Sequence, residues 1–454
     1  MTGPSDGDWR GLDATLTGRV LRPGSPNFHA TSAPFNKRFT GTPAGVVSVA
    51  NIADVRHTVD WARTNGVGIV PRGGGHSYAG FSVGPGLVMD LRGLNALSAN
   101  GSTGLVTAAG GAAMAAVHAA LRPHAMAFAL GNGSDVGIGG LTLGGGSAAV
   151  SRKFGLTADA LVRTEIVTAD GQLLTCDAGE NSDLFWACRG GGGGNFGVNV
   201  SFTFQARPVS DVSTCLLLWD RADAPKVLSV LQEIAAPDEF SVRLGVSTTG
   251  SDVVVSAVGL YLGPASELRQ LLDPVLVVAK PVQEDIADRT YWEANDYLLH
   301  ETSAGAFAAR TNFATESLPD EAIATMLSWI DRWPGSANPD GGGFAMFGWG
   351  GEINRVAATD TAFIHRDASW LLSFDTSWAD SDDAAVVDAN LRWLSGMRDA
   401  LSPYVSDGAY QNFIDPDLDD WRTAYYGVNY PRLVAIKQRV DPDRLFTFAQ
   451  AIGS

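Results

Sequence analysis

One stretch of the chain places a histidine directly behind three glycines. Residues 71–80 read PRGGGHSYAG. Because glycine has no Cβ, its backbone takes positive φ values and approaches a ligand closely. Successive exposed N–H groups in such loops form concave sites that bind anions. The stretch therefore predicts a ligand that lies against bare backbone, with the imidazole of His76 beside it.

Glycine clusters recur further along the chain. Fifty-three of the 454 residues are glycine, against an average content of about 7%. They gather at 73–75, 131–146 and 190–197. Within the first two clusters, residues 73–75, 137–140 and 144–146 are together able to line a long ligand that carries a diphosphate. A set of unrelated tight turns is the alternative interpretation.

Two further glycine motifs match known signatures in their letters alone. Gly192–Gly197 fits G-x-G-x-x-G, but the dinucleotide fingerprint must open a helix, and the following VNVSFTF predicts a strand. Gly80–Gly84 fits the G-x-S-x-G nucleophile elbow, which also needs a helix after the serine. The sequence contains no GK[ST], so a P-loop is excluded.

The charge balance disfavours several partner classes. The net charge of −17 argues against nucleic acid and anionic membrane surfaces. The sequence shows neither a signal-peptide pattern nor the roughly 18-residue apolar run of a membrane span. The seven histidines form no HxxxH or HExxH pair, so we expect no metal site. Cys176, Cys188 and Cys215 show no CxxC spacing, which suits a reducing cytoplasm.

The elements around these motifs change character near residue 208. Residues 46–77 predict strand, helix and strand, with Asn51 at the start of the helix and Gly66 at its end. Residues 105–130 repeat that order. Beyond residue 209, long strands such as 343–356 and 369–378, separated by helices, predict an antiparallel sheet backed by helices. Residues 421–440 predict one helix that ends before Asp441-Pro442.

Five segments, in order, resemble the berberine bridge enzyme-like FAD-linked oxidases of the vanillyl-alcohol oxidase superfamily. These segments are 71–97, 131–162, 183–204, 409–415 and 425–452. The likeness covers nearly the whole chain and is weakest over 209–340. It implies an α+β fold, with a PCMH-type FAD-binding domain in residues 1–208. A C-terminal segment, 408–454, would complete that domain, and an antiparallel-sheet substrate-binding domain, 209–407, would be inserted between them.

The resemblance also implies how FAD is held. A ring nitrogen of His76 would bond to the 8α carbon of the flavin. Many family members add a cysteine bond, but this chain has Gly133 at that position, which implies a single histidyl attachment. The positions that match the family's FAD contacts are Arg72, Gly73, Gly74, Gly75, His76, Ser77, Gly80, Val136, Gly137, Gly139, Gly140, Gly144, Gly145, Gly155, Gly197, Val198, Tyr410 and Asn412.

Two positions set the expected chemistry apart from that of many relatives, and a third matches them. Leu141 replaces a histidine that steadies the reduced flavin, so Tyr78 or backbone N–H groups are candidates for that task. Leu371 replaces the usual catalytic glutamate, and Asp375 lies about 13 Å further along a strand. Tyr410 matches the family's flavin-side tyrosine, although simple packing in the core is an alternative role.

Two more matches concern oxygen and substrate. Val136 occupies the position of the residue that gates O2 access to the flavin, and its small size predicts an open path. Asn412 is expected two residues beyond Tyr410 on the same face of a strand, where it would orient a substrate hydroxyl or amine. The expected catalytic residues are therefore Tyr410, Asn412 and Val136.

The resemblance implies a cytoplasmic FAD-dependent oxidase. It would take hydride from a small alcohol, amine or phenolic compound and return electrons to O2, giving H2O2. The alternatives are a flavin-dependent oxygenase or tailoring enzyme of secondary metabolism, and a binding protein that retains flavin. Either a monomer or a homodimer is expected. Two interpretations account for a group of aromatic residues near the predicted long strands: they bind an apolar substrate, or they pack in the core of the sheet. These residues are Phe344, Phe347, Trp349, Trp370 and Phe374.

Overall fold

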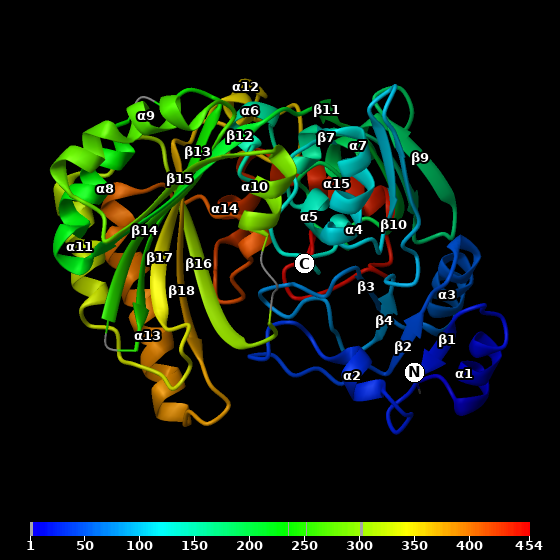
Figure 1. Ribbon diagram of the computed structural model, residues 1–454. Helices are drawn as coiled ribbons and strands as arrows, with labels where there is room; N and C mark the ends of the chain where they lie inside the picture. Colours follow the sequence, from blue (N-terminus) through cyan, green and yellow to red (C-terminus); the bar gives the residue numbers. More distant parts are fainter. Residues whose placement is uncertain (1–2, 235, 251, 300–302) are drawn as a thin grey trace.

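The computed structural model describes residues 3–234, 236–250, 252–299 and 303–454. Its elements form two unlike halves that face each other (Figure 1). One half contains a four-stranded, a five-stranded and a two-stranded sheet together with the glycine-rich loops, and the other contains one large, seven-stranded sheet. Among the described residues, every helix is too short or too polar to cross a lipid bilayer.

The first small sheet has the strand order β1-β2-β4-β3, with β4 parallel to both β2 and β3. These strands are β1 (Arg19–Leu21), β2 (Gly45–Ser48), β3 (Ile69–Arg72) and β4 (Leu87–Asp90). Between β2 and β3 lies α3 (Ile52–Asn65), where the Asn51 side chain accepts a hydrogen bond from the Asp54 N–H. Gly66 ends α3 with φ 64°. The predicted strand, capped helix and strand are confirmed.

The second small sheet is antiparallel and has the strand order β5-β6-β10-β8-β9. These strands are β5 (Leu97–Asn100), β6 (Leu105–Ala109), β8 (Leu161–Val167), β9 (Leu173–Asp177) and β10 (Val198–Gln205). A short pair, β7 (Met126–Ala127) and β11 (Arg207–Pro208), lies beside it. Because β10 directly follows the GGGNFG run, the prediction that this run opens a strand rather than a helix is confirmed.

The large sheet is antiparallel, with the strand order β15-β12-β14-β13-β17-β18-β16. Its strands are β12 (Val212–Asp220), β13 (Phe240–Thr249), β14 (Asp252–Tyr261), β15 (Gln283–Arg289), β16 (Ala306–Ala314), β17 (Gly342–Gly348) and β18 (Trp370–Trp378). One face is covered by α8 (Ala224–Gln232), α9 (Ala265–Val278), α11 (Asp320–Ile330) and α13 (Ala384–Leu401) (Figure 1). This confirms the predicted α+β fold with a helix-backed antiparallel sheet.

The core of this half fills the space between the sheet and those four helices. Leu244 and Phe374 from the strands, and Leu228 and Met326 from the helices, belong to one buried cluster. Strand residues alternate between the two faces. The other face of β13 therefore carries Ser241 and Arg243, which line the cavity between the two halves.

The C-terminal tail returns to the glycine-rich half, where its red ribbon lies among the cyan elements (Figure 1). It forms α14 (Trp421–Tyr426) and α15 (Tyr430–Val440), separated by a turn that begins at Gly427 with φ 44°. The prediction of one continuous helix is therefore wrong, because glycine at this positive φ breaks it. Its predicted end before Asp441 is confirmed. The domain boundaries at 208 and 407 stay predictions.

The remaining helices are short. They are α1 (Asp6–Asp13), α2 (Phe28–Ser32), α4 (Met114–Leu121), α5 (Ile138–Leu143), α6 (Ser151–Phe154), α7 (Ser182–Ala187), α10 (Tyr291–Leu298) and α12 (Glu352–Arg355). The segment 105–127 thus runs through β6, α4 and β7, as predicted. Helix α5 opens at Gly137, so it starts inside the second glycine cluster.

Candidate active site

A cavity of about 1130 Å³ lies between the two halves. It exceeds the roughly 300–1,000 Å³ of a pocket for one drug-sized ligand. Glycine-rich loops at 73–75, 131–140 and 192–194 form one wall, and β13, β17 and β18 form the opposite wall. The cavity is therefore large enough to hold an extended cofactor and a substrate together.

Backbone-to-backbone packing holds the glycine wall in place. A Cβ added at Gly74 would lie 2.5 Å from the Gly137 nitrogen, and one at Gly137 would lie 2.3 Å from the Gly74 nitrogen. Any other residue at either position would force the two loops apart. A Cβ at Gly140 would meet nothing within 4 Å, so the absent side chain there leaves open space at the start of α5.

Arg72 ends β3 directly before the glycines at 73–75 and lines the cavity. It is 4% exposed and donates to the Thr31 and Ala33 carbonyls at 2.8 and 2.6 Å. Burial lowers its pKa. Its Nε is buried and has no hydrogen-bond partner among the described residues. An orphaned donor beside open glycine backbone fits a ligand with phosphate oxygens, so these residues fit the FAD that the sequence predicts.

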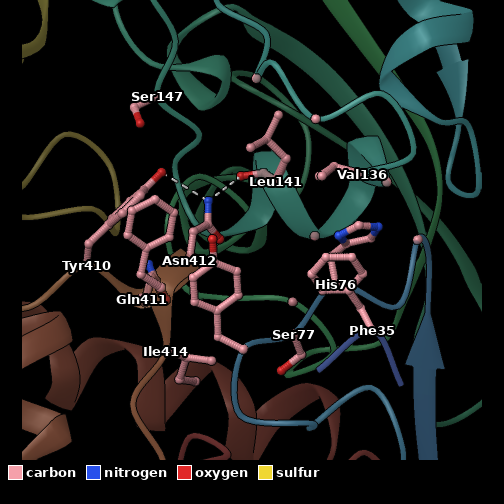
Figure 2. A pocket seen from close by; sticks show the side chains of 18 of the residues that line it. Phe35, His76, Ser77, Val136, Leu141, Ser147, Tyr410, Gln411, Asn412 and Ile414 are labelled. Atoms are coloured by element: carbon pink, nitrogen blue, oxygen red, sulfur yellow. Dashed lines mark hydrogen bonds between the residues drawn. The ribbon is translucent and has the colours of Figure 1, made fainter. Parts of the chain in front are cut away.

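The imidazole of His76 stands at one end of the wall. Its Nε2 lies 3.1 Å from the Asp135 carboxylate. The Phe35 ring stacks on it, with ring centroids 4.1 Å apart (Figure 2). Burial lowers the pKa of His76, and Asp135 partly offsets that effect. The ring is thus held in one orientation and favours its neutral form.

The structure brings most of the predicted site residues to this cavity. Those that line it are Arg72, Gly73, Gly74, Gly75, His76, Ser77, Val136, Gly137, Gly139, Gly140, Gly197, Tyr410 and Asn412. The lining does not include Gly80, Gly144, Gly145, Gly155 or Val198. Gly144 instead makes room for Asn412, because a Cβ there would lie 1.9 Å from its Oδ1.

Tyr410 and Asn412 form a hydrogen-bonded pair on the cavity wall (Figure 2). The predicted strand is absent, because Gln411–Phe413 is a single 3-10 turn that starts after the extended Tyr410. Asn412 Nδ2 nevertheless donates to the Tyr410 hydroxyl at 3.1 Å and to the Leu141 carbonyl at 3.0 Å. The turn brings the two side chains together in place of strand alternation.

The Tyr410 hydroxyl is buried among hydrogen-bond donors. The side chain is 1% exposed, and its oxygen also accepts from the Gly146 N–H at 3.0 Å. Burial raises the pKa of Tyr410, while the groups of Asn412, Ser147 and Gly146 offset part of the rise. These donors are placed to stabilise negative charge on the phenol oxygen.

The sheet wall contributes the polar side chains of Asp375 and Arg243. Leu371 is fully buried beside Tyr410, whereas Asp375 lines the cavity. Desolvation inside the cavity raises the pKa of Asp375 to about 6, and the positive charge of Arg243 on β13 limits this rise. The alternation of Ser241 and Arg243 with Val242 and Leu244 is the signal that identifies this face.

The five aromatic residues that the sequence singles out in β17, in β18 and just after β17 divide between two environments. Phe347 and Trp349 line the cavity. Phe344, Trp370 and Phe374 belong to the core beneath the helices. The sheet-core interpretation therefore applies to three of them, whereas the other two line the cavity.

A buried ion pair fastens the C-terminal tail to the third glycine loop. Lys437 Nζ donates to Asp441 and, at 2.6 Å, to the Asn195 carbonyl. Both charged side chains are at most 3% exposed. The tail thereby fixes the loop 192–197, which lines the cavity in part.

Comparison with known proteins agrees with this architecture. A family described as "FAD binding domain" matches residues 43–177, and "Berberine and berberine like" matches residues 409–453. The chain is 32% identical to the uncharacterized FAD-linked oxidoreductase YgaK of Bacillus subtilis, with 96% of this chain and 97% of that protein covered. It is 30% identical to the chitooligosaccharide oxidase of Gibberella zeae, with 94% and 91% covered.

A solved structure extends the likeness to the whole fold. The BBE-like 1 protein of Physcomitrella patens superimposes with a TM-score of 0.89 at 28% identity, covering 98% of each chain. The fold and the glycine-lined cavity define an FAD-dependent oxidoreductase. More narrowly, the chain belongs to the berberine bridge enzyme-like family of FAD-linked oxidoreductases. The predicted family and the predicted cofactor, FAD, are confirmed.

Proposed function

We propose that this protein is an oxidase that takes hydride from a small organic substrate and uses O2 as the electron acceptor. The single observation that carries the proposal is that one cavity joins the glycine wall to the polar face of the large sheet. The similarity to a protein named as an oxidase supports it. The chemistry that FAD supplies when bound is acceptance of a hydride and transfer of two electrons to O2, which yields H2O2.

The two walls of the cavity have different roles, one in binding FAD and the other in binding the substrate. Residues 1–208 and 408–454 bind FAD, which His76 holds through one covalent bond. Residues 209–407 supply the sheet that binds the substrate, with Phe347 and Trp349 for apolar groups and Arg243 and Asp375 for polar ones. Tyr410 receives the proton of the substrate, and Asn412 orients the hydroxyl or amine that loses it.

A substrate screen carried out first without oxygen and then in air tests the proposal. Alcohols, amines, phenols and oligosaccharides are mixed anaerobically with the holoenzyme, and bleaching of the flavin absorbance is followed. We expect a subset to bleach the flavin and, in air, to release one H2O2 for each substrate oxidised. Bleaching without peroxide, with label from 18-O2 in the product, would instead establish an oxygenase. A flavin that no compound in the panel bleaches would leave the chain as a flavin-retaining binding protein.

Val136 provides a test of the oxygen step. It lines the cavity, and its carbonyl accepts the Met114 N–H at 2.9 Å, so its backbone position is fixed. We expect Val136→Leu to slow reoxidation of the reduced enzyme by about tenfold, which corresponds to about 1.4 kcal/mol of added barrier. Stopped-flow mixing with air-saturated buffer measures this rate.

Val136→Ala is the matched control for that experiment. It removes volume instead of adding it, so reoxidation should be as fast as in the wild type or faster. Slow reoxidation of the wild type, with no difference in Val136→Leu, would contradict a gate at this position.

A further inference from the structure

The carboxylate of Asp135 contacts the histidine that we propose to carry FAD. Its Oδ2 lies 3.1 Å from His76 Nε2, although 59 positions separate the two residues in the chain. The Phe35 ring covers one face of the imidazole. Asp135 therefore contacts the ring at Nε2 and Phe35 packs on its face, and neither contact involves the other ring nitrogen, Nδ1.

The loop that carries Asp135 is held firmly against the loop that carries His76. A Cβ on Gly74 would lie 2.8 Å from the Asp135 carbonyl oxygen. On the other side, the carbonyls of Ser134 and Val136 accept hydrogen bonds from the Ala115 and Met114 N–H groups, each at 2.9 Å. The carboxylate is therefore presented to the imidazole by fixed backbone on both sides.

This contact decides which ring nitrogen is nucleophilic. A neutral imidazole has one N–H donor and one lone-pair acceptor, and the partner of one nitrogen sets the tautomer. When Nε2–H donates to Asp135, Nδ1 carries the lone pair. A carboxylate on the far nitrogen also increases the basicity of the near one, as it does for histidines that bind metals.

We propose that Asp135 is the positioning residue for covalent attachment of FAD. It holds His76 with the lone pair on Nδ1 and takes the Nε2 proton as the bond from Nδ1 to the 8α carbon forms. The inference rests on the proposed histidyl linkage and extends it to a residue outside the set of predicted FAD contacts.

The step balances with O2 as the oxidant. The N–C bond forms at Nδ1, and one C–H bond breaks at the 8α methyl group. The 8α proton and the imidazole proton both leave, and two electrons pass into the flavin ring. O2 then takes the two electrons and two protons as H2O2, which restores the oxidised cofactor. The Asp135 side chain is 55% exposed, so the proton that it accepts can pass to water.

Asp135→Asn is the test, because the amide keeps a hydrogen-bond acceptor but cannot take the proton. Full-length protein produced in a riboflavin-starved host is mixed with FAD, and covalent attachment is followed by intact mass and by acid precipitation. We expect the rate of attachment to fall by about 10²-fold or more, the scale of general acid–base catalysis. The dissociation constant for FAD before attachment should stay within about threefold of the wild-type value, a change of about 0.65 kcal/mol at most. A purely structural role of Asp135 would weaken that binding as well.

Two further variants complete the test. Asp135→Glu keeps a carboxylate and should attach FAD faster than Asp135→Asn. Asp211→Asn removes an exposed carboxylate from the chain outside the cavity lining and should attach FAD at the wild-type rate. Wild-type attachment rates in both Asp135→Asn and Asp135→Glu would overturn the inference alone. Release of FAD from acid-precipitated wild-type protein would instead overturn the histidyl linkage itself.

Discussion

Acid precipitation of His76→Ala is expected to release all of its FAD into the supernatant, whereas the wild-type pellet stays yellow. The physical reason is that the described lining of the cavity contains no cysteine that could form a second bond to the flavin. Burial raises the pKa of all three thiols, to about 11 for Cys188 and to about 12 for Cys215. A thiol needs its thiolate form to attack the flavin, and in the described part of the chain no cysteine lines the cavity.

The measurement separates covalent from noncovalent binding. Intact mass should show the added mass of FAD on the wild type and its complete loss in His76→Ala. The variant should still bind FAD noncovalently, because the glycine wall and Arg72 do not depend on the imidazole. His57→Ala, which removes an exposed imidazole from α3, is the control and should keep its FAD. A yellow pellet from His76→Ala, or a flavin-bearing peptide that contains cysteine, would contradict the prediction.

Local sequence was sufficient to predict the glycine wall. Glycines mark positions where a side chain would collide or where open space is required, and this information needs no partner segment. The cap at Asn51 and the end of α3 at Gly66 followed from the same kind of local rule. The position of His76 at the cavity was predictable for the same reason, because His76 comes directly after the three glycines at 73–75.

Contacts between distant segments were harder to predict. The pairing of Asp135 with His76 depends on how closely Gly74 packs on Gly137, which no local pattern encodes. The polar wall likewise requires the register of β13, β17 and β18, because Arg243 and Asp375 come from strands that meet only through β17. At Tyr410, the expected strand is replaced by a 3-10 turn at Gln411–Phe413.

Tyr410→Phe is expected to lower the anaerobic rate of flavin reduction by about 10²-fold or more, the scale of general base catalysis. The phenol oxygen accepts hydrogen bonds from Asn412 and Gly146. These donors would stabilise the phenolate that a base must use. FAD should stay attached, and reoxidation by O2 should be unchanged, because the substitution removes only the oxygen of a side chain that is 1% exposed.

The rate of flavin reduction in the wild type should increase with pH. Since burial raises the pKa of Tyr410, the phenolate is a minor form at neutral pH. Below that pKa, the fraction of phenolate grows about tenfold for each pH unit, and the reduction rate should grow with it. This rise should be absent in Tyr410→Phe. A plateau that begins near pH 6 would instead point to Asp375, whose pKa lies near that value.

Matched variants separate a base from a packing residue. Tyr425 is also 1% exposed, lies outside the cavity lining, and accepts the Asp415 N–H at 2.8 Å. Tyr425→Phe should therefore reduce stability without changing the rate of flavin reduction. Asp375→Asn should weaken substrate binding more than it slows reduction. If Tyr410→Phe reduces its flavin as fast as the wild type, the tyrosine belongs only to the buried cluster around Leu371, and hydride leaves the substrate without a base from the protein.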